Sequence, residues 1–152
     1  ALGGSMAGAA AADGGGCEGG EGSLLQSDAR ELILSEFRVL RRLEGEEGFP
    51  KVLYFGHQEL LGKESFVLIM PLLGSSVGDL HWETTHGGGM HPEKLVVLGA
   101  QMLSLLERMH ARGVVHRDIK PDNFLMSGPG SHGKLVLIDM GLALLAGEEE
   151  GG

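Results

Sequence analysis

Apolar residues recur at intervals of three and four in the first third of the chain and predict an amphipathic helix over about 29–43. Asp28 and Glu31 have the spacing of a capping box that opens such a helix, and Gly45 is placed to end it. The apolar face is formed by Leu32, Ile33, Phe37, Leu40 and Leu43. Glu36 lies beside this face.

The same period returns over 92–112 and predicts a second, longer helix. Pro92 suits the first turn of a helix, and Gly113 follows its end. The apolar positions are Leu95, Leu98, Met102, Leu105 and Met109. In a larger protein these residues would be covered by neighbouring helices, so we expect part of this face to be exposed here.

Short apolar runs bounded by turn residues predict strands over 51–57 and 65–70, with a turn at Gly62 and Lys63 and an end at Pro71. The runs "FLM" (124–126) and "KLVLID" (134–139) predict two further short strands. Between Pro71 and Pro92 we expect at most one helical turn, near Asp79. Separate helices and short strands place the chain in the α+β class.

Glycine accounts for 27 of the 152 residues and is concentrated near the ends of the chain. Residues 1–26 are rich in Gly and Ala, have little to bury, and are expected to be disordered. The acidic, Gly-containing tail 146–152 is expected to lack regular structure as well.

The net charge of −9 argues against a nucleic acid or an anionic membrane as a partner. We find no apolar run of the roughly 20 residues that a membrane-spanning helix needs, and no secretory signal. The single cysteine, Cys17, fits a reducing compartment. We therefore expect an intracellular protein, cytoplasmic or nuclear or both.

The stretch "HRDIKPDNFLM" (116–126) places a carboxylate, an ammonium group and an amide in one loop, at Asp118, Lys120 and Asn123. Asp139 ends a later apolar strand and is followed closely by Gly141. The oxygens of Asn123 and Asp139 suit Mg²⁺, which prefers hard ligands and accompanies phosphates. Asp118 could accept a proton from a hydroxyl, and Lys120 could neutralise a phosphate. This combination indicates phosphoryl transfer to an alcohol.

"HRDIKPDN" followed by "IDMGLA" resembles the catalytic loop and the magnesium motif of eukaryotic protein kinases. "NFLM", "EGFPKVLYFG" and "LIMPLLGSSVGDL" are similar to segments of the casein kinase I family. The resemblance covers about 27–145 and implies a partial protein-kinase-like fold. Residues 27–73 would form part of the small lobe and the hinge, and residues 74–145 would form part of the large lobe with the catalytic loop.

The resemblance implies a serine/threonine kinase that uses ATP and Mg²⁺ and acts on protein substrates. Asp118 would be the catalytic base, and Lys120 the lysine that contacts the transferred phosphate. Asn123 would be one of the catalytic-loop residues and, together with Asp139, would also bind the metal ion.

The resemblance also implies the residues around the nucleotide. Glu36 would be the glutamate of the small-lobe helix, and Met70 the gatekeeper residue. The backbone of Pro71 and Leu73 would form the adenine-binding hinge. Two further residues are assigned to the nucleotide site in the same way, namely Asp79 just beyond the hinge and Leu125 beneath the adenine. A simple helix cap is the competing interpretation of Asp79.

One element of the kinase pattern is missing before Glu36. Kinases pair this glutamate with a lysine on a preceding strand, and that lysine holds the ATP phosphates. The only basic residue between residue 1 and Glu36 is Arg30, on the predicted helix itself. Met140 also replaces the usual phenylalanine of the Asp-Phe-Gly motif. We therefore expect little or no transfer by this chain alone.

Other interpretations remain open. The chain could be a pseudokinase-like or truncated module that binds nucleotide or acts as a scaffold without transfer. A small-molecule phosphotransferase is disfavoured by the Lys120–Pro121 pair and by "NFLM". The recurrence of His81, His86 and His91 suggests a zinc site, but a Gly-rich loop would not preorganise one. "GGGCEG" (14–19) matches a phosphate-binding pattern through composition alone.

Overall fold

The computed structural model describes residues 8–11, 21–85, 89–128 and 133–147. It contains helices and small antiparallel sheets, which confirms the α+β class. In chain order the elements are β1 (Gly8–Ala11), α1 (Glu21–Arg42), β2 (Tyr54–Leu60), β3 (Lys63–Met70), α2 (Val77–Thr85), α3 (Pro92–Ala111), β4 (Val114–Val115), the 3₁₀ turn η1 (Pro121–Asn123), β5 (Phe124–Met126), β6 (Leu135–Leu137) and β7 (Leu144–Leu145).

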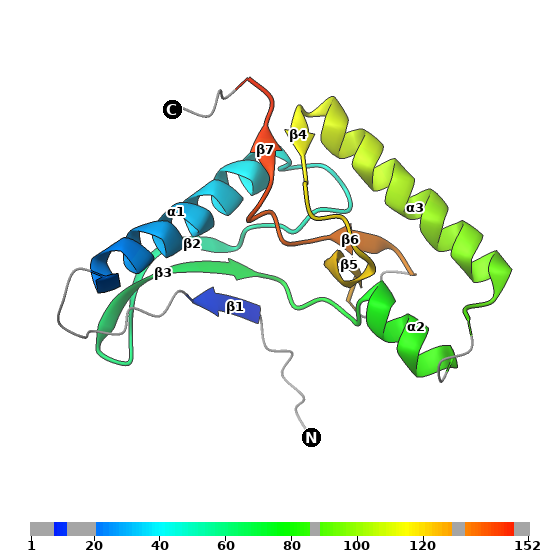
Figure 1. Cartoon of the computed structure of the whole chain (residues 1–152), viewed down its shortest axis with the longest axis horizontal. Coiled ribbons are helices and arrows are strands. Elements are labelled where there is room, and N and C mark those ends of the chain that lie inside the picture. Colours follow the sequence, from blue (N-terminus) through cyan, green and yellow to red (C-terminus); the bar gives the residue numbers. More distant parts are fainter. Residues whose placement is uncertain (1–7, 12–20, 86–88, 129–132, 148–152) are drawn as a thin grey trace.

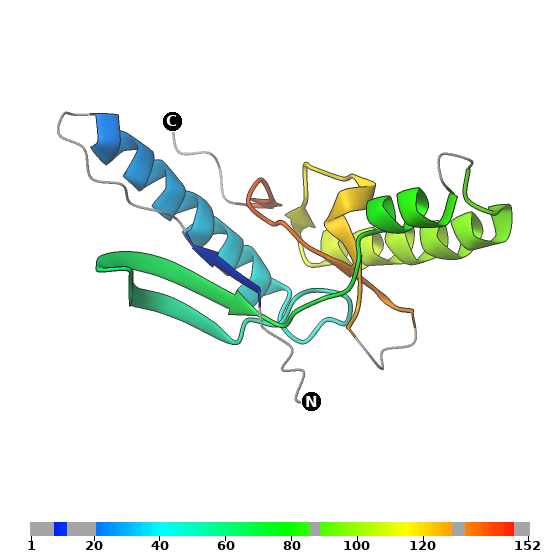
Figure 2. The ribbon, with the colours of Figure 1, turned by 90° about the horizontal axis from the view of Figure 1, so that it is seen from below.

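The first half of the molecule is a three-stranded antiparallel sheet with α1 packed on it. The strand order is β1-β3-β2, and α1 contacts β3 (Figures 1 and 2). β2 and β3 pair from Tyr54–Ile69 to Leu60–Lys63. The two residues between them, Leu61 and Gly62, have φ of 53° and 77°. Positive φ at both central positions is characteristic of the tight hairpin turn whose twist matches that of the strands.

The N-terminal region differs from the sequence-based expectation. Residues 1–26 were expected to be disordered, but Gly8–Ala11 forms β1 and α1 begins at Glu21. The edge of β3 offers unpaired backbone groups, and a strand can pair with them through its own backbone without an apolar pattern. Leu24, Leu25 and Gln26 are good helix formers, so the helix continues through the supposed capping box. Residues 1–7 and 12–20 lie outside the described part of the chain.

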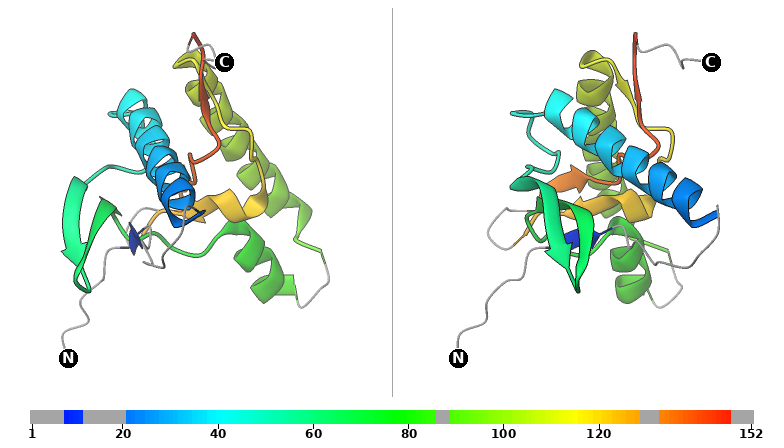
Figure 3. Two further views of the ribbon diagram at one scale, coloured as in Figure 1. Left: turned by 60° about the vertical axis from the view of Figure 1, so that its left-hand side comes forward. Right: turned by 90° about the vertical axis from the view of Figure 1, so that its left-hand side faces the viewer.

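The second half contains α2, α3 and two small antiparallel sheets. β4 pairs with β7, and β5 pairs with β6. The β4–β7 pair lies between α1 and α3, as Figures 1 and 3 show. α2 packs against η1 and β5 and lies on the same side of the molecule as α3 (Figure 2). No helix in the described part of the chain is both long enough and apolar enough to cross a membrane.

α2 is longer than the single turn expected near Asp79, because its first turn is strongly capped. The Ser76 hydroxyl accepts the Asp79 amide at 3.0 Å, and the Asp79 carboxylate accepts the Ser76 amide at 3.1 Å. Each residue thereby satisfies a backbone donor of the other, as in a capping box. The structure therefore supports the helix-cap interpretation of Asp79.

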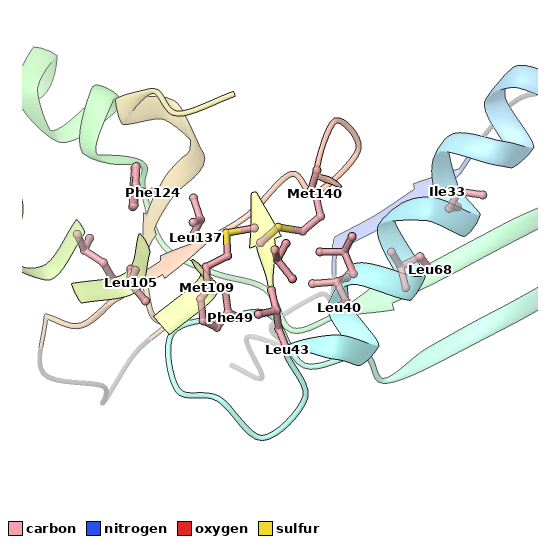
Figure 4. Packing of buried hydrophobic residues seen from close by; sticks show 14 of the residues in the cluster. Ile33, Leu40, Leu43, Phe49, Leu68, Leu105, Met109, Phe124, Leu137 and Met140 are labelled. Atoms are coloured by element: carbon pink, nitrogen blue, oxygen red, sulfur yellow. The ribbon is translucent and has the colours of Figure 1, made fainter. Parts of the chain in front are cut away.

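A single hydrophobic core connects the two halves (Figure 4). It includes Leu40 of α1, Leu43 just after the end of α1, and Met109 of α3, each with at most 2% of its surface exposed. Met140 is completely buried in the same cluster. Of the apolar positions predicted for α3, Leu95 is exposed as expected, whereas Leu105 and Met109 are buried in the core. Val96, Val97 and Leu103 lie outside that predicted set and are exposed as well.

The loop between α1 and β2 forms a second connection between the halves. The carbonyl of Gly48 accepts the Leu137 amide at 2.9 Å, and the carbonyl of Glu47 accepts the Arg108 guanidinium at 2.8 Å. Exposed ion pairs join Glu46 to Arg112 and Glu47 to Lys134. Since exposed ion pairs add little, the close backbone approach at Gly48 matters more for the position of this loop.

Gly48 should not tolerate a side chain. Its φ is +93°, and an added Cβ would lie 2.1 Å from Cδ2 of Leu105, which is buried. We expect Gly48→Ala to lower the free energy of unfolding by about 1–2 kcal/mol for the left-handed backbone and about 1–3 kcal/mol more for overpacking. Chemical denaturation measures the difference.

Gly45→Ala is the matched control, because Gly45 has a φ of +86° and nothing within 4 Å of an added Cβ. It should show the backbone cost alone. Equal losses for the two variants would contradict the close packing of Gly48 on α3.

Substitutions of Leu105 and Leu103 test which face of α3 packs in the hydrophobic core. Leu105 is 1% exposed and Leu103 is 70% exposed on the same helix. Leu105→Ala should cost about 2–5 kcal/mol through lost burial and a cavity, and Leu103→Ala about 0.5 kcal/mol or less. Thermal or urea unfolding of the two variants distinguishes the faces, and a larger loss for Leu103→Ala would refute this assignment.

Candidate active site in the loop between β4 and β5

The loop that follows β4 is fixed from beneath by His116. This side chain is 1% exposed, and its Nε2 lies 2.9 Å from the carbonyl oxygen of Ile138. The amide of Asp118 donates to Nδ1 at 3.3 Å, so the proton of the ring lies on Nε2 and is donated to Ile138. His116 therefore links the backbone of the loop to the segment that follows β6.

Arg117 adds a second link. Its Nε donates to the carbonyl of Leu142 at 2.5 Å. Arg117 and Asp139 have φ of 67° and 64°, a left-handed conformation that is uncommon outside glycine. Leu61 in the β2–β3 turn is the other described non-glycine residue of this kind. Strained backbone of this type clusters at functional sites, and two such residues flank the candidate site.

Asp118, Lys120 and Asn123 form one hydrogen-bonded cluster. The Lys120 ammonium lies 2.6 Å from Oδ2 of Asp118, and Nδ2 of Asn123 donates to the same oxygen at 3.1 Å. Nδ2 of Asn123 also donates to the Asp118 carbonyl at 2.8 Å. The Asn123 side chain is nearly buried, whereas those of Asp118 and Lys120 are partly exposed. The structure thus brings together the three residues predicted for the catalytic loop.

This cluster controls the charge of Asp118. The hydrogen bond from Lys120 is the main cause that lowers the pKa of the Asp118 carboxyl, with help from Asn123 and against the effect of burial. The same contact raises the pKa of Lys120, to which the charges of Asp139 and Asp122 also contribute. Both groups are therefore ionised at neutral pH.

Asp139 reaches the site through the β5–β6 pair. The amide of Ile138 donates to the carbonyl of Asn123 at 2.9 Å, directly beyond the pairing of Phe124 with Leu137. Asp139 is the next residue, and its negative charge acts on both Lys120 and Glu36. The shared coordination of one metal ion by Asn123 and Asp139 stays a prediction.

Glu36 enters the site from α1. Burial raises the pKa of its carboxyl, a hydrogen bond from the Met140 amide lowers it, and the Asp139 charge raises it further. Among the described residues, no cation is paired with Glu36. The position of Glu36 on this helix was predicted from the sequence, whereas its link to Met140 joins residues far apart in the chain that no local pattern relates.

The residues predicted for the hinge lie on the connection between β3 and α2. Met70 and Leu73 are partly buried, and Pro71 is exposed. Gly74 donates its amide to the Met126 carbonyl at 2.7 Å, and Ser76 forms a bridge to Leu125. This pairing places the connection between β3 and α2 beside β5. Contact of the predicted hinge residues with an adenine stays a prediction.

Asp79, which was predicted to contact the nucleotide, forms hydrogen bonds with Ser76. Its Oδ2 accepts both the hydroxyl and the amide of Ser76, at 2.7 and 3.1 Å, and the hydroxyl is the main cause that lowers the pKa of Asp79. A structural role for Asp79 is thereby established, and a role at the nucleotide remains untested.

The described residues do not form a zinc site. No group of three or more His, Cys, Asp or Glu side chains in the described ranges is placed to hold a metal ion. His81 and His91 belong to these ranges, and His86 lies outside them. The donors of the candidate site suit a different ion. The amide nitrogen of Asn123 donates to the carbonyl and the carboxylate of Asp118, so the Asn123 amide oxygen and the Asp139 carboxylate are the hard oxygens that fit Mg²⁺.

Comparison with known proteins agrees with this geometry. The family described as "Protein kinase domain" matches residues 23–150. The chain is also similar to the casein kinase 1-like protein HD16 of Oryza sativa subsp. japonica, with 36% identity over 141 residues, which cover 82% of this chain and 19% of that protein. The chain therefore spans about a fifth of the length of its rice relative. With the Asp118 cluster and Asp139 in the arrangement described above, the family match shows that this chain belongs to the protein kinases.

Proposed function

We propose that the chain carries the catalytic loop of a serine/threonine kinase of the casein kinase I type, which transfers the γ-phosphate of ATP to a protein hydroxyl. The observation that carries this proposal is the Asp118 carboxylate, held by Lys120 and Asn123 close to Asp139. The similarity to a casein kinase 1-like protein supports it.

Asp118 is suited to orient the acceptor hydroxyl and to receive its proton. Lys120 and Asn123 both bind Oδ2, which leaves Oδ1 as the oxygen that can accept a hydrogen bond from a substrate. The lowered pKa of Asp118 keeps it ionised at neutral pH. General base catalysis needs the base within hydrogen-bonding reach of the hydroxyl, and a fixed carboxylate provides that geometry.

Lys120 is suited to stabilise the phosphoryl group in transit. Its side chain is 46% exposed, so its ammonium can turn from Asp118 toward a phosphate. Asn123 and Asp139 would hold Mg²⁺, which neutralises charge on the phosphates when it is bound. The connection from Met70 to Leu73, with Leu125 beneath it, would hold the adenine.

The surroundings of Glu36 favour slow phosphate transfer by the chain, or the alternative in which the chain binds nucleotide without transfer. A kinase pairs this glutamate with a lysine that anchors the ATP phosphates, and the described residues place no cation there. By analogy with the loss of one oxyanion donor, a missing anchor would cost about 10²–10³ in rate. We propose that the chain alone transfers phosphate slowly, and a module that binds nucleotide without transfer is the second candidate.

The transfer hypothesis is tested in the chain and in a chimera. In the chimera, the first strands of a casein kinase I small lobe, including their lysine, replace residues 1–20. We expect the chimera to phosphorylate casein about 10²–10³ times faster than the chain. Asp118→Asn should reduce the rate of the chimera by about 10²–10⁴, because the base is lost. Labelled γ-phosphate measures both effects.

Asp122→Asn is the control for Asp118→Asn, since Asp122 is an exposed carboxylate of the same loop. It should leave the rate nearly unchanged. Rapid transfer by the bare chain, abolished by Asp118→Asn, would show that the anchoring lysine is dispensable. A chimera that binds ATP but shows no transfer dependent on Asp118 would support the binding module instead.

The metal assignment is tested by nucleotide binding. Asp139→Asn removes one negative charge, and asparagine tolerates the left-handed backbone of this position. The Kd for ATP in Mg²⁺ should rise about 10-fold or more, as loss of even an outer-shell partner costs a metal site 10- to 100-fold. In EDTA the variant and the parent chain should bind ATP equally weakly. Calorimetry or fluorescence provides the Kd, and a Kd in Mg²⁺ that is insensitive to the substitution would exclude Asp139 as a ligand.

A further inference from the structure

Two buried amides on the outer edge of β6 need partners that β5 does not supply. The Ile138 amide donates to the Asn123 carbonyl, and in an antiparallel pair the amides of alternate residues point away from the partner strand. In β6 these are the amides of Leu135 and Leu137, whose residues are at most 3% exposed. A buried amide without an acceptor is costly, so both amides must bind groups outside the β5–β6 pair.

Helix α3 supplies the partner of Leu135 from a side chain. Oε1 of Gln101 accepts the Leu135 amide at 3.0 Å, and Nε2 of Gln101 donates to the Gly133 carbonyl at 3.3 Å. One side-chain amide thus binds a donor and an acceptor on the same edge, as a residue of a neighbouring strand would. The Leu137 amide is accepted by the Gly48 carbonyl from the loop after α1, at 2.9 Å.

The side chains of the two strands do not define how they are paired. Phe124–Met126 and Leu135–Leu137 are apolar at every position, so a slip in register exchanges one apolar residue for another and moves no polar residue into the core. The connection 127–134 is longer than the two-residue turns that define a register. The Ser127 hydroxyl donates to the Lys134 carbonyl, but the Ser127 amide already donates to the same oxygen. A group that recognises particular positions of β6 is therefore needed, and Gln101 is such a group.

The register decides which residues meet at the candidate site. Asn123 immediately precedes β5, and Asp139 follows the residue that is paired with Asn123. A slip by two residues would leave each side chain on its own face but would move Asp139 roughly 7 Å along β5. Ligands of Mg²⁺ lie about 2.1 Å from the ion, so Asn123 and Asp139 could no longer share one.

We propose that Gln101 is a positioning residue, whose side-chain amide holds β6 in the register that keeps Asp139 beside Asn123. The inference rests on the proposed function where it concerns Mg²⁺ and ATP. Its direct consequence is protection of the Leu135 amide, which does not depend on catalysis or on nucleotide.

Hydrogen exchange in the full chain tests the direct consequence. Gln101→Leu keeps a side chain of similar size but leaves the Leu135 amide without its acceptor. Exchange at Leu135 should accelerate about 5- to 100-fold, and exchange at Ile138 should accelerate as well. Gln101→Glu keeps an acceptor oxygen and should restore most of the protection at Leu135. Glu107→Leu replaces an exposed polar residue of the same helix and should leave both amides unchanged.

An amide in the other half of the molecule separates the proposed role from a general loss of stability. The Leu53 amide donates to the Ile69 carbonyl at 2.8 Å, next to the β2–β3 pair, and serves as the internal reference. We expect its exchange to change little in Gln101→Leu. Acceleration at Leu53 equal to that at Leu135 would overturn the positioning role. So would equal exchange at Leu135 in Gln101→Leu and Gln101→Glu, or in Gln101→Leu and the parent chain.

Binding of ATP tests the consequence for the site. Gln101→Leu should raise the Kd for ATP in Mg²⁺ about 10-fold, as loss of an outer-shell partner does at a metal site, and leave the Kd in EDTA unchanged. An equal rise in Mg²⁺ and in EDTA would indicate a merely structural role and overturn the proposal.

The failure of this proposal is distinguishable from the failure of the proposed function. If exchange responds as expected but the parent chain does not bind ATP in Mg²⁺, the hold of Gln101 on β6 stands and the proposed function fails. If the parent chain binds ATP in Mg²⁺ and Gln101→Leu leaves that Kd unchanged, the positioning role fails and the proposed function stands.

Discussion

Met140 is fully buried among side chains from both halves of the molecule, and its backbone is fixed at the same point. Its amide lowers the pKa of Glu36 of α1, and its carbonyl accepts the Ala143 amide at 3.0 Å. The residue before it, Asp139, has a left-handed backbone with a φ of 64°. The buried thioether of Met140 thus packs where side chains from α1 and from the second half of the molecule meet. A methionine can fill the space that other kinases give to a phenylalanine, because its unbranched chain adapts to an irregular cavity.

The electrostatics of the site follow from the same arrangement. Lys120 offsets the charge of Asp118, but Asp139 and Glu36 bring two further carboxylates toward the same region. Like charges that approach in a partly buried place raise each other's pKa, and a cation relieves the repulsion. The described residues do not provide a second cation beside Glu36, so a bound Mg²⁺ would have a larger influence on the charge balance here than in a kinase with the anchoring lysine.

The Asp118 cluster was predictable from sequence because its members lie within a few residues of each other. Asp118, Lys120 and Asn123 are ordered by one loop, and the loop is set by the helix before it and the strand after it. Long-range features gave no such signal. The contact of Gly48 with Leu105 and the link from Glu36 to Met140 depend on how distant elements pack, and neither has a local pattern. The full length of α2 was not predicted, although Ser76 and Asp79, which cap its first turn, are only three residues apart.

The pairing of β1 with β3 has a consequence for how this edge of the sheet can change in evolution. The four residues of β1, Gly8–Ala11, include no side chain larger than a methyl group, and the ladder that joins them to β3 is made of backbone groups alone. Backbone pairing excludes proline only at positions whose N–H points toward β3, and it selects no particular side chain. The edge of β3 can therefore pair with strands of many sequences. Splicing or recombination could place another strand there, with or without a lysine, and the pairing of β3 with β2 would be preserved. The same core could thus be shared by a chain that transfers phosphate and by one that does not.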